Sequence, residues 1–515
     1  MGERIQPLHA VVAVIVLLLL VSCASTSTTS SEAVPTLIVP AATATAPQRT
    51  PAPPAVPLSM TASPSTRAST APTNVALTPP LTRTPAASAT ATVAATPAIG
   101  LSAADWPTYH RDTARTGAVA NAPNPQRLTE AWHQSLDGAV YAEPLVVDGR
   151  VVVATEANSL YALDARTGQI QWRTNVGEPV RGADLPCGNI DPLGITGTPV
   201  YDPHTRLIFA VAEVGGPAHV LVGVDLQTGA VKVRRPADPP DMEPVAQQQR
   251  AALALAGSLV YISYGGLYGD CGNYHGWVVA APTEGAGSLL AFQVPTTREG
   301  GIWAPSGPAI DAAGKLYVSV GNGEAISGSW DHSDSVLRLS PTLQLEDGFA
   351  PTTWPRDNAA DADLGSMGPV LLPNGWMFAA GKSGQGYLLH ADALGGVGGQ
   401  VWEGPVCRAF GGAAVSGRSI FVPCEDGLRQ VQLEPSGRIT LGWQAPPQVS
   451  GSPIVGGQTV YSLDLQGMLY ALDSTSGAVR ASISVGTTTR FATPTLVGDQ
   501  MFVGTLAGIV AVTIA

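Results

Sequence analysis

The sequence predicts an all-β fold, an eight-bladed β-propeller of four-stranded antiparallel blades that an N-terminal strand closes into a ring. Three observations predict it. Short runs of β-branched and aromatic residues recur as a unit along the chain, tight-turn residues separate the runs, and the unit returns eight times. A closed ring of repeats would make one folded unit of residues 101–515, a length that is large for one ordinary domain.

The repeated unit is clearest at residues 143–172 and 452–477. In both, an apolar run follows a proline, Asp-Gly or Gly-Gly turns the chain, and Leu-Tyr-Ala-Leu-Asp precedes Thr-Gly or Ser-Gly. Asp-Gly and Gly-Gly between such runs favour tight hairpins. In the second turn, the aspartate is expected to accept nearby backbone N–H groups, and the glycine supplies a positive φ. Each unit therefore predicts four antiparallel strands.

The inner strand of each unit is expected to begin near a recognisable step in the sequence. The eight steps are Glu143-Pro144, Thr198-Pro199, Ala251-Leu253, Gly307-Pro308, Gly368-Pro369, Gly412-Ala413, Ser452-Pro453 and Thr493-Pro494. The last unit, Phe491 to Ala515, lacks one strand, and the segment Leu128 to Leu136 with Trp132 can supply it. Such a closure hides sheet edges that would otherwise pair with other chains.

Two motifs in this region resemble those of a known family. Ala162-x-Asp164-x-x-Thr167-Gly168-x-x-x-Trp172 resembles the tryptophan-docking repeat of the pyrroloquinoline quinone (PQQ) propellers, and residues 105–117 are similar to the lead-in of PQQ-repeat proteins. The resemblance covers residues 105–515 and implies the propeller fold, with Trp172 as a blade-packing residue. Proteins with this repeat include quinoprotein enzymes. They also include cofactor-free lipoproteins similar to the outer-membrane barrel-assembly propeller.

The N-terminus predicts export and a lipid anchor. Residues 1–22 read as a signal peptide, because Arg4 precedes the apolar run Ala10–Val21, which is shorter than the roughly 20 apolar residues of a membrane span. The run Leu20 to Cys23 resembles the lipobox of bacterial lipoproteins. That resemblance implies that an acylated Cys23 tethers the chain to the cell membrane or cell surface, outside the cytoplasm. The alternative is an ordinary signal peptide that contains a cysteine.

Residues 23–100 predict a disordered stalk. They consist almost entirely of Ala, Thr, Pro and Ser, which bury too little apolar surface to offset the entropy of an ordered chain. The whole chain has a net charge of −12, and the folded part carries −14, since the signal peptide is neutral and the stalk has one glutamate and three arginines. An acidic surface repels phosphates, so the sequence argues against a nucleic-acid partner.

Four cysteines follow Cys23, and an even number outside the cytoplasm predicts disulfides. Cys407 and Cys424 flank the first two strands of the sixth unit, so both are expected at one end of one blade. Cys187 lies in the loop into the second blade and Cys271 in a loop of the third, on the same face. We therefore predict the pairs Cys407–Cys424 and Cys187–Cys271. A metal site is the alternative, but no C-x-x-C motif supports it.

The long loops are expected on one face of the ring, opposite the tight turns at 148–149 and 374–375. They span residues 264–277, 321–335 and 354–367. Loops longer than a turn requires are where propellers place function, and aromatic, cationic and acidic residues there favour a polar anionic ligand or a sugar. The candidate ligand-binding residues are Tyr274, His275, Trp303, Asn322, Asp334, Lys382 and Arg408. The alternative is that these loops only plug the central tunnel.

Three functions remain open from the sequence. The favoured one is a monomeric, non-catalytic binding or scaffold module for a protein or glycan, with neither a cofactor nor a metal. The alternative is a PQQ- and calcium-dependent quinoprotein dehydrogenase that oxidises alcohols or sugars. Resemblance to its alcohol-dehydrogenase branch would require two adjacent cysteines, which the sequence lacks. The third is a glycan hydrolase or lyase, for which Asp361 and Asp363 would supply the paired carboxylates.

Overall fold

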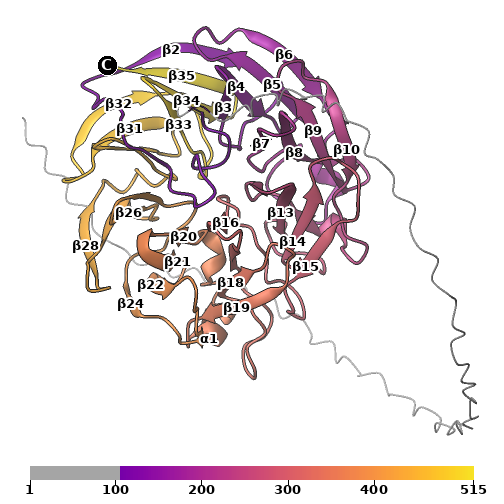
Figure 1. Ribbon diagram of the computed structural model, residues 1–515, viewed down its shortest axis with the longest axis vertical. Helices are drawn as coiled ribbons and strands as arrows, with labels where there is room; N and C mark the ends of the chain where they lie inside the picture. The colour runs from indigo at the N-terminus through magenta and orange to yellow at the C-terminus, as the bar shows by residue number, and fades with distance from the viewer. Residues whose placement is uncertain (1–101, 103–104) are drawn as a thin grey trace, which may run out of the picture. The chain divides into compact units, whose positions relative to one another are not determined.

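The computed structural model of the protein describes Ser102 and residues 105–515, and in this part the chain winds into a ring of eight β-sheets (Figure 1). The predicted eight-bladed, all-β propeller is confirmed. The predicted signal peptide 1–22, the lipidation residue Cys23 and the stalk 23–100 lie outside the described residues, so they stay predictions.

The first four blades follow one another along the chain, each built from its innermost strand outward. Their strands are, for blade 1, β3 (Leu145–Val147), β4 (Arg150–Ala154), β5 (Ser159–Asp164) and β6 (Ile170–Asn175); for blade 2, β7 (Val200–Asp202), β8 (Leu207–Val214), β9 (Ala218–Asp225) and β10 (Val231–Pro236); for blade 3, β12 (Ala254–Ala256), β13 (Leu259–Gly266), β14 (Trp277–Pro282) and β15 (Leu290–Gln293); and for blade 4, β16 (Ala309–Ile310), β17 (Leu316–Val320), β18 (Ser335–Leu339) and β19 (Leu345–Ala350).

The remaining blades continue around the ring in the same order. Their strands are, for blade 5, β20 (Val370–Leu371), β21 (Trp376–Ala380), β22 (Gln385–His390) and β24 (Trp402–Pro405); for blade 6, β25 (Ala414–Ser416), β26 (Ser419–Val422), β27 (Arg429–Leu433) and β28 (Ile439–Gln444); for blade 7, β29 (Ile454–Gly456), β30 (Thr459–Leu463), β31 (Met468–Asp473) and β32 (Val479–Ser484); and for blade 8, β33 (Thr495–Val497), β34 (Gln500–Thr505), β35 (Gly508–Ile514) and β2 (Leu128–Ser135).

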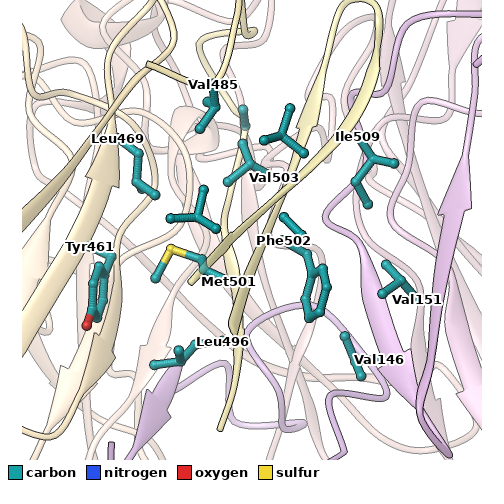
Figure 2. Close-up of a cluster of buried hydrophobic side chains, with 14 of the residues drawn as sticks. Val146, Val151, Tyr461, Leu469, Val485, Leu496, Met501, Phe502, Val503 and Ile509 are labelled. Carbon is teal, nitrogen blue, oxygen red and sulfur yellow. The ribbon is translucent and has the colours of Figure 1, made fainter. Parts of the chain in front are cut away.

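Each inner strand begins at the residue after the predicted step, so all eight predicted starts are confirmed. Proline precedes six of these strands, a position where its missing N–H breaks no ladder hydrogen bond. The predicted closure is also confirmed, because β2 pairs antiparallel with β35 and places Leu128 opposite Ile514. One apolar cluster then spans blades 7, 8 and 1, where Val151, Leu469 and Phe502 are fully buried (Figure 2). This cluster joins the first and last blades of the ring.

Tryptophans of the outer strands dock onto the next blade. The indole N–H of Trp172 in β6 donates to the carbonyl of Leu226 in blade 2, and the ring covers Gly229. Trp132 covers Gly168 of blade 1 in the same way, and Trp443 covers Gly477 of blade 7. The predicted packing role of Trp172 is thus confirmed, and the glycine that follows Thr or Ser in the repeat makes room for the indole.

Replacing Gly229 with alanine is expected to lower the free energy of unfolding by about 2 kcal/mol. Gly229 has a φ of +72°, which alanine adopts at a cost, and a Cβ there would lie 2.8 Å from the indole ring of Trp172. Urea unfolding followed by circular dichroism measures the change. Gly215→Ala is the matched control, because it lies in a turn of the same blade with no atom within 4 Å of the new Cβ. An equal loss in both variants would contradict the docking account.

The lead-in, residues 105–117, fills the centre of the ring on the tight-turn side. Arg115 is 1% exposed and donates to the backbone carbonyls of Leu253 and Pro308, which precede the inner strands of blades 3 and 4. Beside it, the backbone N–H of His110 donates to the buried carboxylate of Glu143, before blade 1. The segment therefore acts as a plug that ties several blades together.

Other elements of the described chain were not expected from the sequence. Three short strands extend blades at their edges, and a one-and-a-half-turn helix and four 3₁₀ turns lie in loops. They are β1 (Ala118–Val119), β11 (Gln247–Gln248), β23 (Gly396–Val397), α1 (Trp354–Ala359) and the 3₁₀ turns Gly182–Asp184, Pro244–Ala246, Leu364–Ser366 and Pro373–Gly375. Within the described residues, no helix combines the length and apolar character that a membrane crossing requires.

Candidate functional site

A cavity of about 550 Å³ opens on the loop-rich face. Its walls come from blades 2 to 6 and from the loop into blade 8. The lining residues are Asn189, Arg250, Gly266, Leu267, Tyr268, Gly269, Asp270, Tyr274, Trp303, Asn322, Asp361, Lys382, Arg408, Phe410, Arg490 and Phe491. Because they belong to many loops that converge on the ring axis, the cavity exists only when the propeller is closed.

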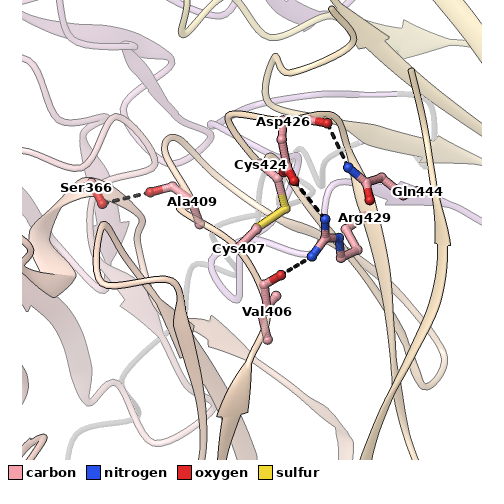
Figure 3. The surroundings of a disulfide bond; sticks show 8 residues. All are labelled: Ser366, Val406, Cys407, Ala409, Cys424, Asp426, Arg429 and Gln444. Atoms are coloured by element: carbon pink, nitrogen blue, oxygen red, sulfur yellow. Dashed lines mark hydrogen bonds and ion pairs between the residues drawn. A yellow bond between two sulfur atoms is a disulfide. The ribbon is translucent and has the colours of Figure 1, made fainter. Parts of the chain in front are cut away.

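Both predicted disulfides are present, and both hold loops of this cavity. Cys187–Cys271 links the loop that carries Asn189 to the loop 266–274. Cys407–Cys424 fixes the chain directly before Arg408, and Arg429 holds the same segment by donating to the carbonyl of Val406 (Figure 3). Cross-links of this kind restrict loop motion and so pre-organise the cavity walls.

Five of the seven candidate residues line this one cavity. They are Tyr274, Trp303, Asn322, Lys382 and Arg408. His275 is half-buried beside Tyr274 but does not line the cavity. Asp334 lies beneath it and is 1% exposed, where it accepts the backbone N–H of Leu364, and burial raises the pKa of its carboxyl well above the usual range. The binding role of these residues stays a prediction, but their convergence on one face is a feature of the fold.

Trp303 forms one flat wall of the cavity. It lies against Gly265 at the end of β13, where a Cβ would come within 2.8 Å of the Trp303 Cβ. Two cations lie over its ring, since the guanidinium carbon of Arg250 is 4.8 Å from the ring centroid and the Lys382 ammonium is 5.2 Å from it. Contacts of this kind are favourable because the ring face is electronegative.

Four residues that make the cavity lining cationic and aromatic were not predicted from the sequence: Arg250, Phe410, Arg490 and Phe491. Arg250 and Arg490 come within a few residues before the inner strands β12 and β33, at the point where a chain reaches the ring axis. A cation at that position of a repeat is a signal that could have found them. Phe491 lies 5.1 Å from the Arg250 guanidinium, and Phe410 lies 4.1 Å from that of Arg490.

The acids Asp361 and Asp363, in and beneath the cavity lining, are ion-paired with a lysine. Lys382 contacts the carboxylates of Asp361 and Asp363, the latter at 2.9 Å. Burial alone would lower the pKa of Lys382, but the two carboxylates raise it, so the ammonium stays charged. Both aspartates contact the same lysine, and Asp363 is fully buried outside the lining, so it does not face the cavity as one carboxylate of a glycan-hydrolase pair would.

The cavity lining also contains three arginines that have too few carboxylate partners. Arg408 and Arg490 share one carboxylate, that of Glu425, at 3.5 and 3.8 Å. Arg250 forms no ion pair and no hydrogen bond with any described residue, and its Nε is buried. Burial lowers the pKa of Arg250 to about 10, so the guanidinium remains charged at neutral pH. The cationic wall, which we define as Arg250, Arg408 and Arg490, thus carries a positive excess.

Arg250 and Phe491 also form the floor of the cavity. Beneath them lies a pocket of about 10 Å³, which is lined by Tyr109 and Glu143 among others. That volume is about what one water requires. Below it the lead-in closes the ring, so the tunnel is filled and the cavity is a blind site that opens on one face.

A calcium ion does not fit the residues present. Calcium takes six to eight oxygen ligands from carboxylates, carbonyls and waters, and a cation already paired with a carboxylate competes with it. Asp363 is paired with Lys382, and Glu299, which accepts the Asn322 amide, is paired with Arg298. Among the described residues, the one group with metal-ligand proximity is Cys407, Cys424 and Asp426, where the two sulfurs form a disulfide. A calcium ion at this cavity would have to displace Lys382 from Asp363 or Arg298 from Glu299, so these residues are a poor fit for the calcium-dependent centre considered from the sequence.

The fold and its repeats define a PQQ-like β-propeller. The chain belongs to the family of the outer membrane protein assembly factor BamB, whose sequence profile matches residues 123–270 and 347–515, more than half of the chain. A comparison with curated proteins finds no match. The profile leaves residues 271–346 unmatched, the region that carries Tyr274, Trp303 and Asn322.

Solved structures share the fold at low sequence identity. Quinohemoprotein alcohol dehydrogenase ADHIIG from Pseudomonas putida HK5 is 13% identical, with a TM-score of 0.63 over 80% of each chain. A europium-containing methanol dehydrogenase is 14% identical, with a TM-score of 0.63 over 80% of this chain and 98% of that one. BamB from Moraxella catarrhalis is 13% identical, with a TM-score of 0.53 over 75% of this chain and 100% of that one. Enzymes and an assembly factor thus share this architecture, so function must be argued from the site.

Proposed function

We propose that this protein is a lipid-anchored, extracytoplasmic binding propeller that captures a glycan in the cavity of its loop-rich face and catalyses no reaction. The observation that carries the proposal is the state of the cavity's side chains. Asp361 and Asp363 are ion-paired with Lys382, and Glu299 is ion-paired with Arg298. The aromatic and cationic groups, in contrast, face open space. Such a lining suits recognition.

The cavity favours a glycan over a protein surface. It is a blind, converging site of about 550 Å³, and a chain end or a single sugar reaches into such a site more readily than a flat protein face does. Tyr268, with 67% of its surface exposed, stands at the rim and Trp303 stands within. Flat aromatic side chains at the rim and wall offer contact area at a low entropic cost, which suits sugar rings.

A quinoprotein dehydrogenase is the second candidate, because the fold is shared with such enzymes and the cationic wall suits the carboxylates of PQQ. Two features disfavour it: the pairing of Asp363 and Glu299 with cations, and the two cations that lie over the ring of Trp303, where a planar cofactor would stack. When bound, PQQ would supply two-electron oxidation, and Arg250, Arg408 and Arg490 would hold its carboxylates.

Dye-linked turnover decides between the two candidates. The full-length protein is incubated with PQQ and calcium and assayed for dye reduction with a panel of alcohols and aldoses. We expect no turnover above that of the free cofactor. Saturable, enzyme-dependent dye reduction would overturn the non-catalytic role.

The anchor is tested through Cys23. The proposal rests on the lipobox-like run that ends at Cys23 and on the Ala/Thr/Pro/Ser-rich stretch that follows it. In a bacterial host, the wild-type chain is expected to incorporate radiolabelled palmitate and to sediment with membranes. Cys23→Ala is expected to lose the label and most of the membrane-bound protein, whereas Ser22→Ala, which keeps a small residue before the cysteine, should retain both. Labelling of the Cys23→Ala chain would contradict a lipid anchor at this position.

A further inference from the structure

We propose that Arg250 is the anchor of the cavity and binds the single carboxylate of an acidic sugar. This inference rests on the proposed binding role and goes further, because it names the group that is recognised and the residue that recognises it.

Arg250 has no counter-charge among the described residues of the cavity. Every other cation of the cavity faces a carboxylate: Lys382 has Asp361 and Asp363, and Arg408 and Arg490 have Glu425. Arg250 has none, although its Nε is buried. Burying a charge without a partner is unfavourable, so a fold that keeps one at its axis is arranged to receive the counter-charge from outside. The planar fork of a guanidinium matches a carboxylate with two parallel hydrogen bonds.

The side chain of Arg250 lies between the rings of Trp303 and Phe491, at 4.8 and 5.1 Å from their centroids. These contacts hold the guanidinium in one place and so reduce the entropy lost when it binds a ligand. The same two residues are walls of the cavity, so a ligand whose carboxylate reaches Arg250 brings its ring beside them.

Arg408 and Arg490 add a positive excess that attracts an anion toward the cationic wall. Asp270 and Asp361 stand elsewhere in the lining, where Asp270 accepts the hydroxyl of Tyr274. A ligand with negative charge all around its ring would meet these acids. A ligand with one carboxylate at one edge of its ring can place that charge against the cationic wall and its uncharged atoms near Asp270 and Asp361.

The test uses matched pairs of ligands that differ in the carboxylate alone. Glucuronate is compared with glucose, and 2-naphthoate with 2-naphthamide, by calorimetric titration into the full-length protein. We expect glucuronate to bind, and glucose to bind roughly 30-fold more weakly or not at all. Binding of 2-naphthoate without binding of glucuronate would show that the site takes an aromatic acid and would overturn the inference.

Variants assign the effect to Arg250. Arg250→Met keeps the length of the side chain and is expected to weaken binding of the acid by roughly 30-fold, without a lower melting temperature, because an unpaired buried charge is removed. Arg418→Met is the control: Arg418 is an exposed arginine in a tight turn of blade 6, outside the cavity, and its loss should leave binding unchanged. If Arg250→Met does not fold, the comparison of acid and neutral ligand on the wild type decides.

The inference is overturned if glucuronate does not bind, if glucose binds equally well, or if Arg250→Met binds glucuronate like the wild type. Equal binding of glucose would leave the glycan-binding role intact. Turnover with PQQ and calcium would instead overturn the non-catalytic role, so the two failures are distinguishable.

Discussion

Arg115→Met is expected to lower the free energy of unfolding by about 4 kcal/mol or more, a large fraction of a domain's stability. The guanidinium donates four hydrogen bonds of 2.8–3.0 Å, to the carbonyls of Tyr109, Leu253 and Pro308 and to the hydroxyl of Thr108. Methionine fills a similar volume but leaves these buried acceptors without a donor. Because Leu253 and Pro308 begin blades 3 and 4, the loss loosens the centre of the ring.

Urea unfolding followed by tryptophan fluorescence measures this effect. Arg127→Met is the matched control, since Arg127 is an exposed arginine of the same N-terminal segment, and we expect a change within about 0.5 kcal/mol. A loss of less than about 1 kcal/mol for Arg115→Met would show that the lead-in contributes little to the stability of the ring.

His219→Leu is expected to cost about 3–5 kcal/mol. His219 in β9 is 1% exposed and lies 2.6 Å from a carboxylate oxygen of Asp238 and 3.6 Å from one of Glu213. Burial alone would lower the pKa of His219, but the two carboxylates raise it to about 10. Leucine would remove this charge and leave two acids inside the protein without a cation. His133→Leu is the control, because His133 and its partner Glu130 form an exposed pair of small expected value.

The raised pKa of His219 also predicts a pH dependence. The folded-state pKa of about 10 lies above the ordinary 6.5, so the stabilisation by the charged imidazole is complete below about pH 6.5 and is lost as the pH rises through about 10. The wild-type protein should therefore lose stability across this window in urea titrations at a series of pH values. A flat profile between pH 6.5 and 10 would show that His219 is not charged in the folded protein.

The fold could be predicted because its determinants are local. Turn dipeptides, β-branched runs and a proline before most inner strands repeat in each blade, and the structure places each inner strand directly after the predicted step. Even the closing strand β2 was predictable, since the last repeat is one strand short. The plug formed by the lead-in was not predictable, because Arg115 reaches carbonyls 138 and 193 residues away, and only the closed ring brings them together.

The site was predicted in part for the same reason. Tyr274, Trp303 and Lys382 stand in loops that exceed a turn or next to them, and such loops are visible in the sequence. The position of Arg250 just before the inner strand β12 marks it as a residue near the ring axis, but not as a residue without a counter-charge. The proposed role of Arg250 depends on the lack of a carboxylate near it in the folded protein, and spacing along the chain does not reveal this. The ion pairs of Asp361 and Asp363 with one lysine could not be predicted from the sequence for the same reason.

The most direct test of the account is the affinity of the full-length protein for PQQ, measured by equilibrium dialysis with and without calcium. The account holds that the cavity is an anion site and a poor fit for calcium. It therefore predicts that any binding of PQQ, an aromatic acid, is the same in calcium and in chelator, and that Arg250→Met weakens it. A PQQ affinity that rises tenfold or more on addition of calcium, about 1.4 kcal/mol of coupling, would contradict this account and favour a quinoprotein.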